Sequence, residues 1–114
     1  MPVSERLQTL WPGFGDTRRT IQDIWNAAYQ QLEAQLDSTS FNAGLRGAVL
    51  VDFEPEQVTF VVVTRTSFAR DVLLGRLERT VKRILRDICG QQVEVRYWLL
   101  EEWVGRGTSD EQIA

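Results

Sequence analysis

The stretch VVVTRTSFARDVL, residues 61–73, changes its structural pattern within a few residues. Its first half is rich in β-branched residues and is typical of a buried strand, and its second half has the spacing of a helix. Thr66 or Ser67 supplies an N-cap for this helix. Phe68, a large apolar ring, follows directly. Two interpretations remain open: the ring folds inward as a hydrophobic staple, or it points outward to contact a partner.

The helix that begins at this junction is expected to span residues 67–89, with Gly90 as its stop signal. Its apolar side chains form one core stripe, namely Leu73, Leu77, Val81, Ile84 and Ile88. Four arginines spaced three, four and three residues apart share the opposite face, namely Arg76, Arg79, Arg83 and Arg86. This arginine face is either a solvated helix surface or a site for an anionic partner such as single-stranded nucleic acid.

The remaining elements follow from the same two periodicities, 3.6 residues for helices and two for strands. We expect further helices over residues 20–36 and 38–45, and strands over residues 48–53, 57–64 and 93–99. Pro55 lies in the turn between the first two strands. The order α-α-β-β-α-β predicts an α+β fold, a three-stranded sheet with helices packed on one face.

The length of 114 residues fits one domain, to which we assign three parts. Residues 1–20 form an irregular arm in which Trp11 and Phe14 fold back onto the domain. Residues 21–104 form the folded interaction domain, and residues 105–114 are a polar tail.

The composition argues against catalysis. The chain has no histidine and only one cysteine, so the usual general base, an intrachain disulfide and a thiolate metal cluster are all missing. Cys89 sits among apolar residues, which favours a core role. No apolar run approaches the roughly 18 residues of a membrane span, and no signal peptide is evident. We therefore expect a cytoplasmic protein that is not an enzyme, with no cofactor, no small-molecule substrate and no membrane partner.

Two segments together resemble a known family. They are IWNAAYQQLEAQLDSTSFNAGLR, residues 24–46, and SFARDVLLGRLERTVKRILRDICGQQVEVRYWL, residues 67–99. Their hydrophobic spacing is similar to that of the N-terminal domain of the bacterial replication initiator DnaA, present here as an excised domain or a stand-alone relative. The positions that carry the resemblance are Trp25, Leu32, Leu36, Phe41, Phe68, Asp71, Gly90 and Val95.

The resemblance implies a fold related to K-homology domains and a role in protein interaction. It implies weak self-association through the first helix at Trp25, although a core tryptophan is an equally open interpretation. It implies contact with the replicative helicase or an initiator regulator at Phe68, and at Ser40, where the family often carries an acidic residue. It also implies weak affinity for single-stranded DNA. The sequence thus leads to two hypotheses, an interaction module of the replication-initiation type and, as the alternative, a nucleic-acid-binding module.

Overall fold

The strand β2 (Thr59–Thr64) lies at the centre of the sheet in the computed structural model, which describes residues 4–11 and 19–105. β1 (Val49–Glu54) pairs with β2 in the antiparallel sense, and β3 (Glu94–Leu99) pairs with β2 in parallel. The helical elements are, in chain order, η1 (Glu5–Gln8), α1 (Ile21–Gln35), α2 (Ser38–Gly44), α3 (Ser67–Val72), the π-helical turn η2 (Leu73–Leu77) and α4 (Glu78–Cys89).

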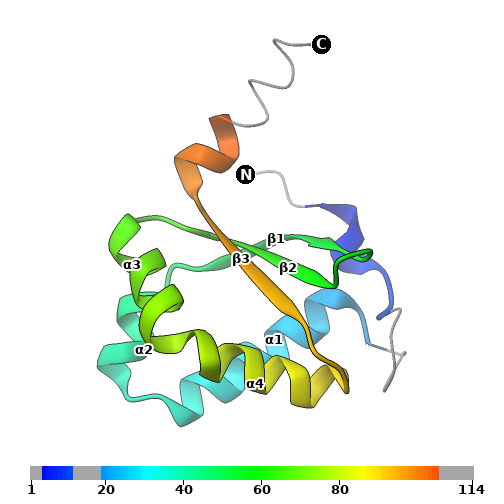
Figure 1. The fold of residues 1–114 in the computed structure, drawn as a ribbon, viewed down its shortest axis with the longest axis horizontal. Coiled ribbons are helices and arrows are strands. Elements are labelled where there is room, and N and C mark those ends of the chain that lie inside the picture. Colours follow the sequence, from blue (N-terminus) through cyan, green and yellow to red (C-terminus); the bar gives the residue numbers. More distant parts are fainter. Residues whose placement is uncertain (1–3, 12–18, 106–114) are drawn as a thin grey trace.

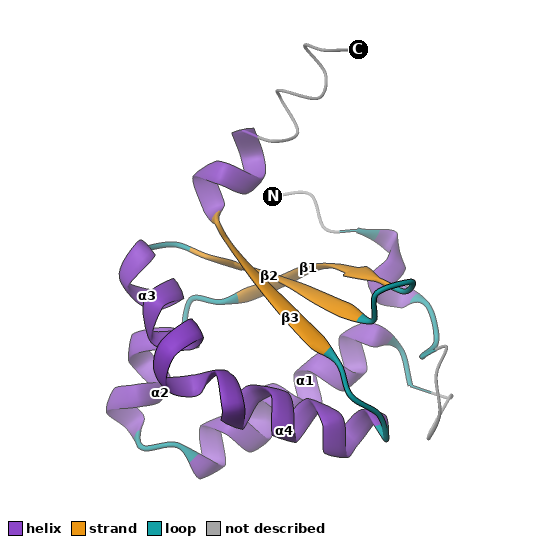
Figure 2. Cartoon of the chain, in the orientation of Figure 1, coloured by secondary structure: helices purple, strands orange, loops and turns teal. Residues whose placement is uncertain are grey.

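The predicted α+β fold, with its α-α-β-β-α-β order and three-stranded sheet, is confirmed. The helices α1, α2 and α4 gather on one side of the strands (Figure 1, Figure 2). None of the helices in the described part of the chain has the length and apolar character needed to cross a lipid bilayer.

All six residues of β2 are buried, because the sheet is covered on both faces. Phe60 and Val62 belong to the main core, which the helices share with the inner face of the sheet. Val61 and Val63 point the other way and form a second apolar cluster with Val51. A fully buried strand needs no polar alternation, which explains the continuous apolar run in this part of the sequence.

A helical segment that the sequence did not predict covers this outer face. Residues 100–105 are helical, and Trp103 packs against the outer cluster together with Trp98 and Leu100. The rings of Trp98 and Trp103 meet edge to face, with 5.9 Å between their centroids. The segment EEWV lacks both a capping residue and a clear apolar period, so its helix depends on burial of Trp103 rather than on local signals.

The N-terminal arm folds back onto the domain, as the sequence predicts for Trp11. This ring is 2% exposed, and its centroid lies 5.5 Å from that of Phe53 and 6.2 Å from that of Phe60. Leu7 of η1 is also fully buried. The Ser4 N–H donates a hydrogen bond of 2.9 Å to the Val51 carbonyl, which ties the arm to β1. Phe14 lies outside the described residues.

The prediction of one regular α-helix over residues 67–89 is wrong at η2, where a π-turn separates α3 from α4. In an α-helix a step of four residues turns by about 400°, so the series Leu73, Leu77, Val81 drifts by about 40° at each step. The wider hydrogen-bond repeat of a π-turn offsets part of this drift. As a result all three side chains face the core. Gly90 ends α4 in the left-handed conformation, with φ of 72°, as expected of a C-terminal glycine.

Candidate protein-interaction site

Phe68 lies on the surface at the start of α3. Its side chain is 65% exposed, the largest exposed fraction among the large apolar residues described. The inward, staple-like alternative is therefore wrong, and the outward orientation is the one observed. The ring is therefore accessible to a partner, although a single exposed apolar side chain is also common on protein surfaces.

The backbone that carries Phe68 is fixed by a helix cap. The Thr66 hydroxyl accepts a hydrogen bond of 3.1 Å from the Ala69 N–H, and the Thr66 carbonyl accepts one of 3.2 Å from the Arg70 N–H. Both bonds flank Phe68, so its ring stands on a closed helical turn. Less conformational entropy is lost on binding when a contact residue is held in place beforehand.

Of the two arginines near Phe68, one is in an ion pair and the other is not. The Arg70 guanidinium lies 3.3 Å from the Glu102 carboxylate, which joins α3 to the helical residues after β3. Arg65, just before the cap, is exposed and makes no ion pair with a described residue. An apolar ring with a free arginine beside it is the composition found at protein-interaction hot spots.

Ser40 has a local structural role in α2. Its N–H donates a hydrogen bond of 3.0 Å to the carboxylate of Asp37, the N-cap of that helix. Hydrogen bonds from the Ser40 side chain and backbone, in that order, lower the pKa of the Asp37 carboxyl. The Arg76 guanidinium lowers this pKa further. α2 packs against α3, so Ser40 and Phe68 lie on adjoining helices.

Trp25 is a core residue. Only 3% of its surface is exposed, and its ring centroid lies 6.4 Å from that of Phe60 on β2. Of the two interpretations of Trp25, a self-association residue that would be part-exposed and a core residue, the core alternative is therefore the one observed. Its edge borders a shallow groove of about 300 Å³ between α1 and β1, which Asn26, Tyr29 and the 40% exposed Val49 also line.

The π-turn divides the predicted arginine face. Arg79, Arg83 and Arg86 line a shallow hollow of about 280 Å³ on α4, together with Lys82, Gln92 and Val93. We call this the α4 basic hollow. Arg76 belongs to η2 and does not line it. Lys82, which is not one of the four predicted arginines, also lines the hollow, because it lies three residues after Arg79 and four before Arg86 on the same helix face.

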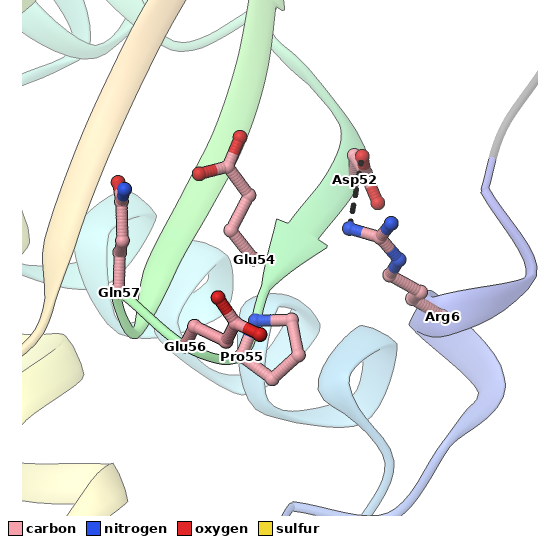
Figure 3. A pocket seen from close by; sticks show the side chains of 6 residues that line it. All are labelled: Arg6, Asp52, Glu54, Pro55, Glu56 and Gln57. Atoms are coloured by element: carbon pink, nitrogen blue, oxygen red, sulfur yellow. Dashed lines mark ion pairs between the residues drawn. The ribbon is translucent and has the colours of Figure 1, made fainter.

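A second hollow of about 460 Å³ lies at the β1–β2 turn (Figure 3). The side chains of Asp52, Glu54 and Glu56 surround it, and Arg6 borders it from η1. Arg6 Nη1 lies 3.7 Å from the Asp52 carboxylate and donates a hydrogen bond of 3.2 Å to the Phe53 carbonyl. Arg6 is 46 residues from Asp52 in the sequence, and only the fold brings the two side chains together.

The single cysteine of the chain is buried in the core. Cys89 is 1% exposed, and burial raises the pKa of its thiol to about 12, so it stays protonated at neutral pH. This agrees with the core role that the sequence predicts. Among the described residues, no three histidine, cysteine or acidic side chains are arranged to hold a metal ion.

Comparison with known protein families adds no assignment, because no family model matches this sequence.

Proposed function

We propose that this chain is a non-catalytic protein-interaction module of the replication-initiation type, which recruits a replicative helicase or an initiator regulator. The observation that supports this best is the 65% exposure of Phe68 on a capped helical turn. A partner with an apolar pocket would gain from covering the ring, and a carboxylate at the rim of that pocket would pair with Arg65.

Phe68→Ala tests the proposal in a pull-down or titration with a replicative helicase or an initiator regulator. We expect the dissociation constant to rise by about thirtyfold, since loss of a hot-spot ring costs on the order of 2 kcal/mol. The melting temperature should stay near that of the wild type, because the ring is exposed. A buried phenylalanine would instead cost about 3–5 kcal/mol of stability.

Leu74→Ala is the matched control, since Leu74 is a 45% exposed apolar residue in the same helical segment. It should leave binding unchanged. Equal binding by wild type and Phe68→Ala would remove Phe68 from the interface, and equal losses in both variants would indicate an effect that is not specific to the ring.

A second candidate function, weak binding of single-stranded nucleic acid, is favoured by the four cationic side chains of the α4 basic hollow. Binding of this kind falls steeply with salt, because each neutralised phosphate releases counterions. Arg79→Glu combined with Arg83→Glu should abolish it. The control is Arg46→Glu combined with Arg65→Glu, two exposed positions that give the same change of net charge. Absence of binding by the wild type at low salt would rule this candidate out.

A further inference from the structure

The strand β3 has one side without a partner strand. Over its whole length, from the pair Glu94–Thr59 to the pair Leu99–Thr64, it bonds to β2. It is the last strand in the sheet order, and within residues 4–11 and 19–105 no further strand or bridge lies beyond it (Figure 1). A free strand edge presents backbone donors and acceptors to any extended chain that approaches it.

The direction of these backbone groups follows from the parallel pairing. The Glu94 N–H donates a bond of 2.9 Å to the Val58 carbonyl, so Glu94 faces β2. In a parallel ladder the residues that face the neighbour alternate with residues that face away. Val95 and Tyr97 therefore direct their N–H and C=O groups outward, and no described group bonds to them.

The opposite edge of the sheet is already occupied. On β1 the Val51 carbonyl accepts a hydrogen bond from the Ser4 N–H, and the Phe53 carbonyl accepts one from the Arg6 guanidinium. The N-terminal arm thus covers the β1 edge. Of the two edges, β3 is the one whose outward backbone groups have no hydrogen-bond partner among the described residues. The exposed surface there is small, since Val95 is 7% and Tyr97 9% exposed.

The α4 basic hollow borders the start of this open edge. Gln92 and Val93, which line the hollow, lead directly into β3. The positive charge of Lys82 is balanced by two carboxylates, since its Nζ lies 2.8 Å from the Glu94 carboxylate and 3.6 Å from that of Glu78. Arg79 has no carboxylate within ion-pair distance in the described part of the chain.

Each of the other two arginines of the hollow makes one polar contact with a described side chain. Arg83 bonds to the neutral Gln35 side chain of α1 at 3.2 Å, and Arg86 pairs with Asp87 at 3.8 Å. The hollow thus keeps an excess of positive charge next to unpaired backbone groups, a combination that favours an incoming chain with carboxylates.

We propose that the free edge of β3 and the α4 basic hollow form one binding site for an extended acidic segment of a partner protein. The segment adds to the sheet as a fourth strand: its backbone pairs with Val95 and Tyr97, and its carboxylates contact Arg79 and Arg86. Strand addition of this kind combines main-chain hydrogen bonds, which give affinity, with side-chain contacts, which give specificity. The site does not include Phe68 and does not depend on the role proposed for that ring.

The backbone pattern favours a peptide over a nucleic acid at this site. The outward carbonyls of Val95 and Tyr97 need regularly spaced donors, which the N–H groups of an extended peptide supply. A sugar-phosphate backbone offers acceptors at its phosphates and would leave these carbonyls unpaired.

Hydrogen exchange of backbone amides, followed by NMR, tests the proposal. The probe is a blocked peptide of about ten residues that alternates glutamate and valine. At saturation we expect the amides of Val95 and Tyr97 to exchange at least about tenfold more slowly, while those of Arg96 and Trp98, already directed toward β2, change little. This alternation is specific to strand addition.

Three controls separate the contributions. The same peptide with alternate backbone nitrogens methylated cannot form the ladder and should give no protection. Arg79→Glu combined with Arg86→Glu should weaken binding of the unmodified peptide at least about tenfold, more strongly at low salt. Oligothymidine of about twelve nucleotides should leave Val95 and Tyr97 unprotected. Equal protection by the methylated peptide, or protection of these two amides by oligothymidine, would overturn the proposal, as would absence of protection with the unmodified probe.

Discussion

Gly44 of α2 packs so closely on η2 that a Cβ atom at this position would stand 3.0 Å from Leu77 Cδ1 and 3.1 Å from Val72 Cγ1. The contact holds α2 against the helical segment that carries Phe68. A larger residue at this position would have to displace one helix from the other.

We predict that Gly44→Leu lowers the free energy of unfolding by about 1–3 kcal/mol, the usual cost of overpacking a core. Gly75→Leu is the control, because a Cβ there meets nothing within 4 Å. It should raise the same quantity by up to about 1 kcal/mol, since leucine favours helix formation over glycine. Urea denaturation measures both, and a Gly44→Leu protein as stable as wild type would contradict the packing described.

Two tyrosines should respond in opposite ways to loss of their hydroxyl groups. The Tyr97 hydroxyl is buried and has no hydrogen-bond partner among the described residues, whereas the Tyr29 hydroxyl donates a bond of 3.2 Å to the Leu45 carbonyl. Tyr97→Phe should keep or raise the free energy of unfolding, because it removes an unpaired polar group, and Tyr29→Phe should lower it by about 1 kcal/mol. Thermal and urea unfolding measure both variants. A Tyr97→Phe protein that loses more free energy of unfolding than Tyr29→Phe would contradict this prediction.

Trp25→Ala should act on folding rather than on association. Removing a core ring costs about 3–5 kcal/mol, so we expect a melting temperature far below that of the wild type. A stable variant that only loses self-association would instead mean that Trp25 contacts a second copy.

Self-association through α1, a proposal based on the family resemblance, must use residues other than Trp25. Asn26, an exposed residue that lines the groove beside β1, is a suitable position. We predict weak dimerisation of the wild type in sedimentation equilibrium and its loss in Asn26→Arg, because a symmetric interface brings two copies of the new charge together. Gln31→Arg, exposed on another face of α1, should still dimerise. A wild type that remains monomeric at high concentration ends the proposal.

Alkaline pH should destabilise the fold through Cys89. Burial raises the pKa of its thiol from an ordinary value of 9.0 to about 12, so above pH 9 the unfolded chain loses this proton first. The unfolded state then binds fewer protons than the folded state, and stability falls as pH rises, by about 1 kcal/mol at about pH 10. Cys89→Ala lacks this contribution. Urea unfolding at about pH 8 and about pH 10 should show that the variant loses less free energy of unfolding between these pH values than the wild type does. Equal losses in the two proteins would assign the effect to other titratable groups.

Local patterns predicted much of the fold, and they failed where tertiary contacts decide. The β-branched run before Thr64 and the cap at Thr66 fix the strand, the helix start and the position of Phe68, and these are confirmed. The π-turn is not visible in the sequence, because the four-residue spacing of Leu73 and Leu77 is compatible with an α-helix until both must face one core.

The candidate site shows the same division. Helical spacing already places Trp25 in the apolar stripe of α1, four residues after Ile21 and three before Ala28, and the fold adds Phe60, the ring on the sheet against which Trp25 packs. Helical spacing is enough to place Lys82 beside Arg79 and Arg86, three residues from the first and four from the second. It cannot show the residues that close the hollow, Gln92 and Val93, because they belong to the chain leading into β3.

The parallel pairing of β3 with β2 has a consequence for the order of folding. β1 and β2 are joined by a short turn, and a hairpin of this kind forms within about 1–10 μs. β3 pairs with β2 only after the chain has passed through α3, η2 and α4. The paired residues are therefore far apart in the sequence, which raises the entropic cost of loop closure and the contact order of the domain. Docking of β3 is therefore expected to limit the folding rate, and conservative substitutions in β3 should slow refolding more than they speed unfolding.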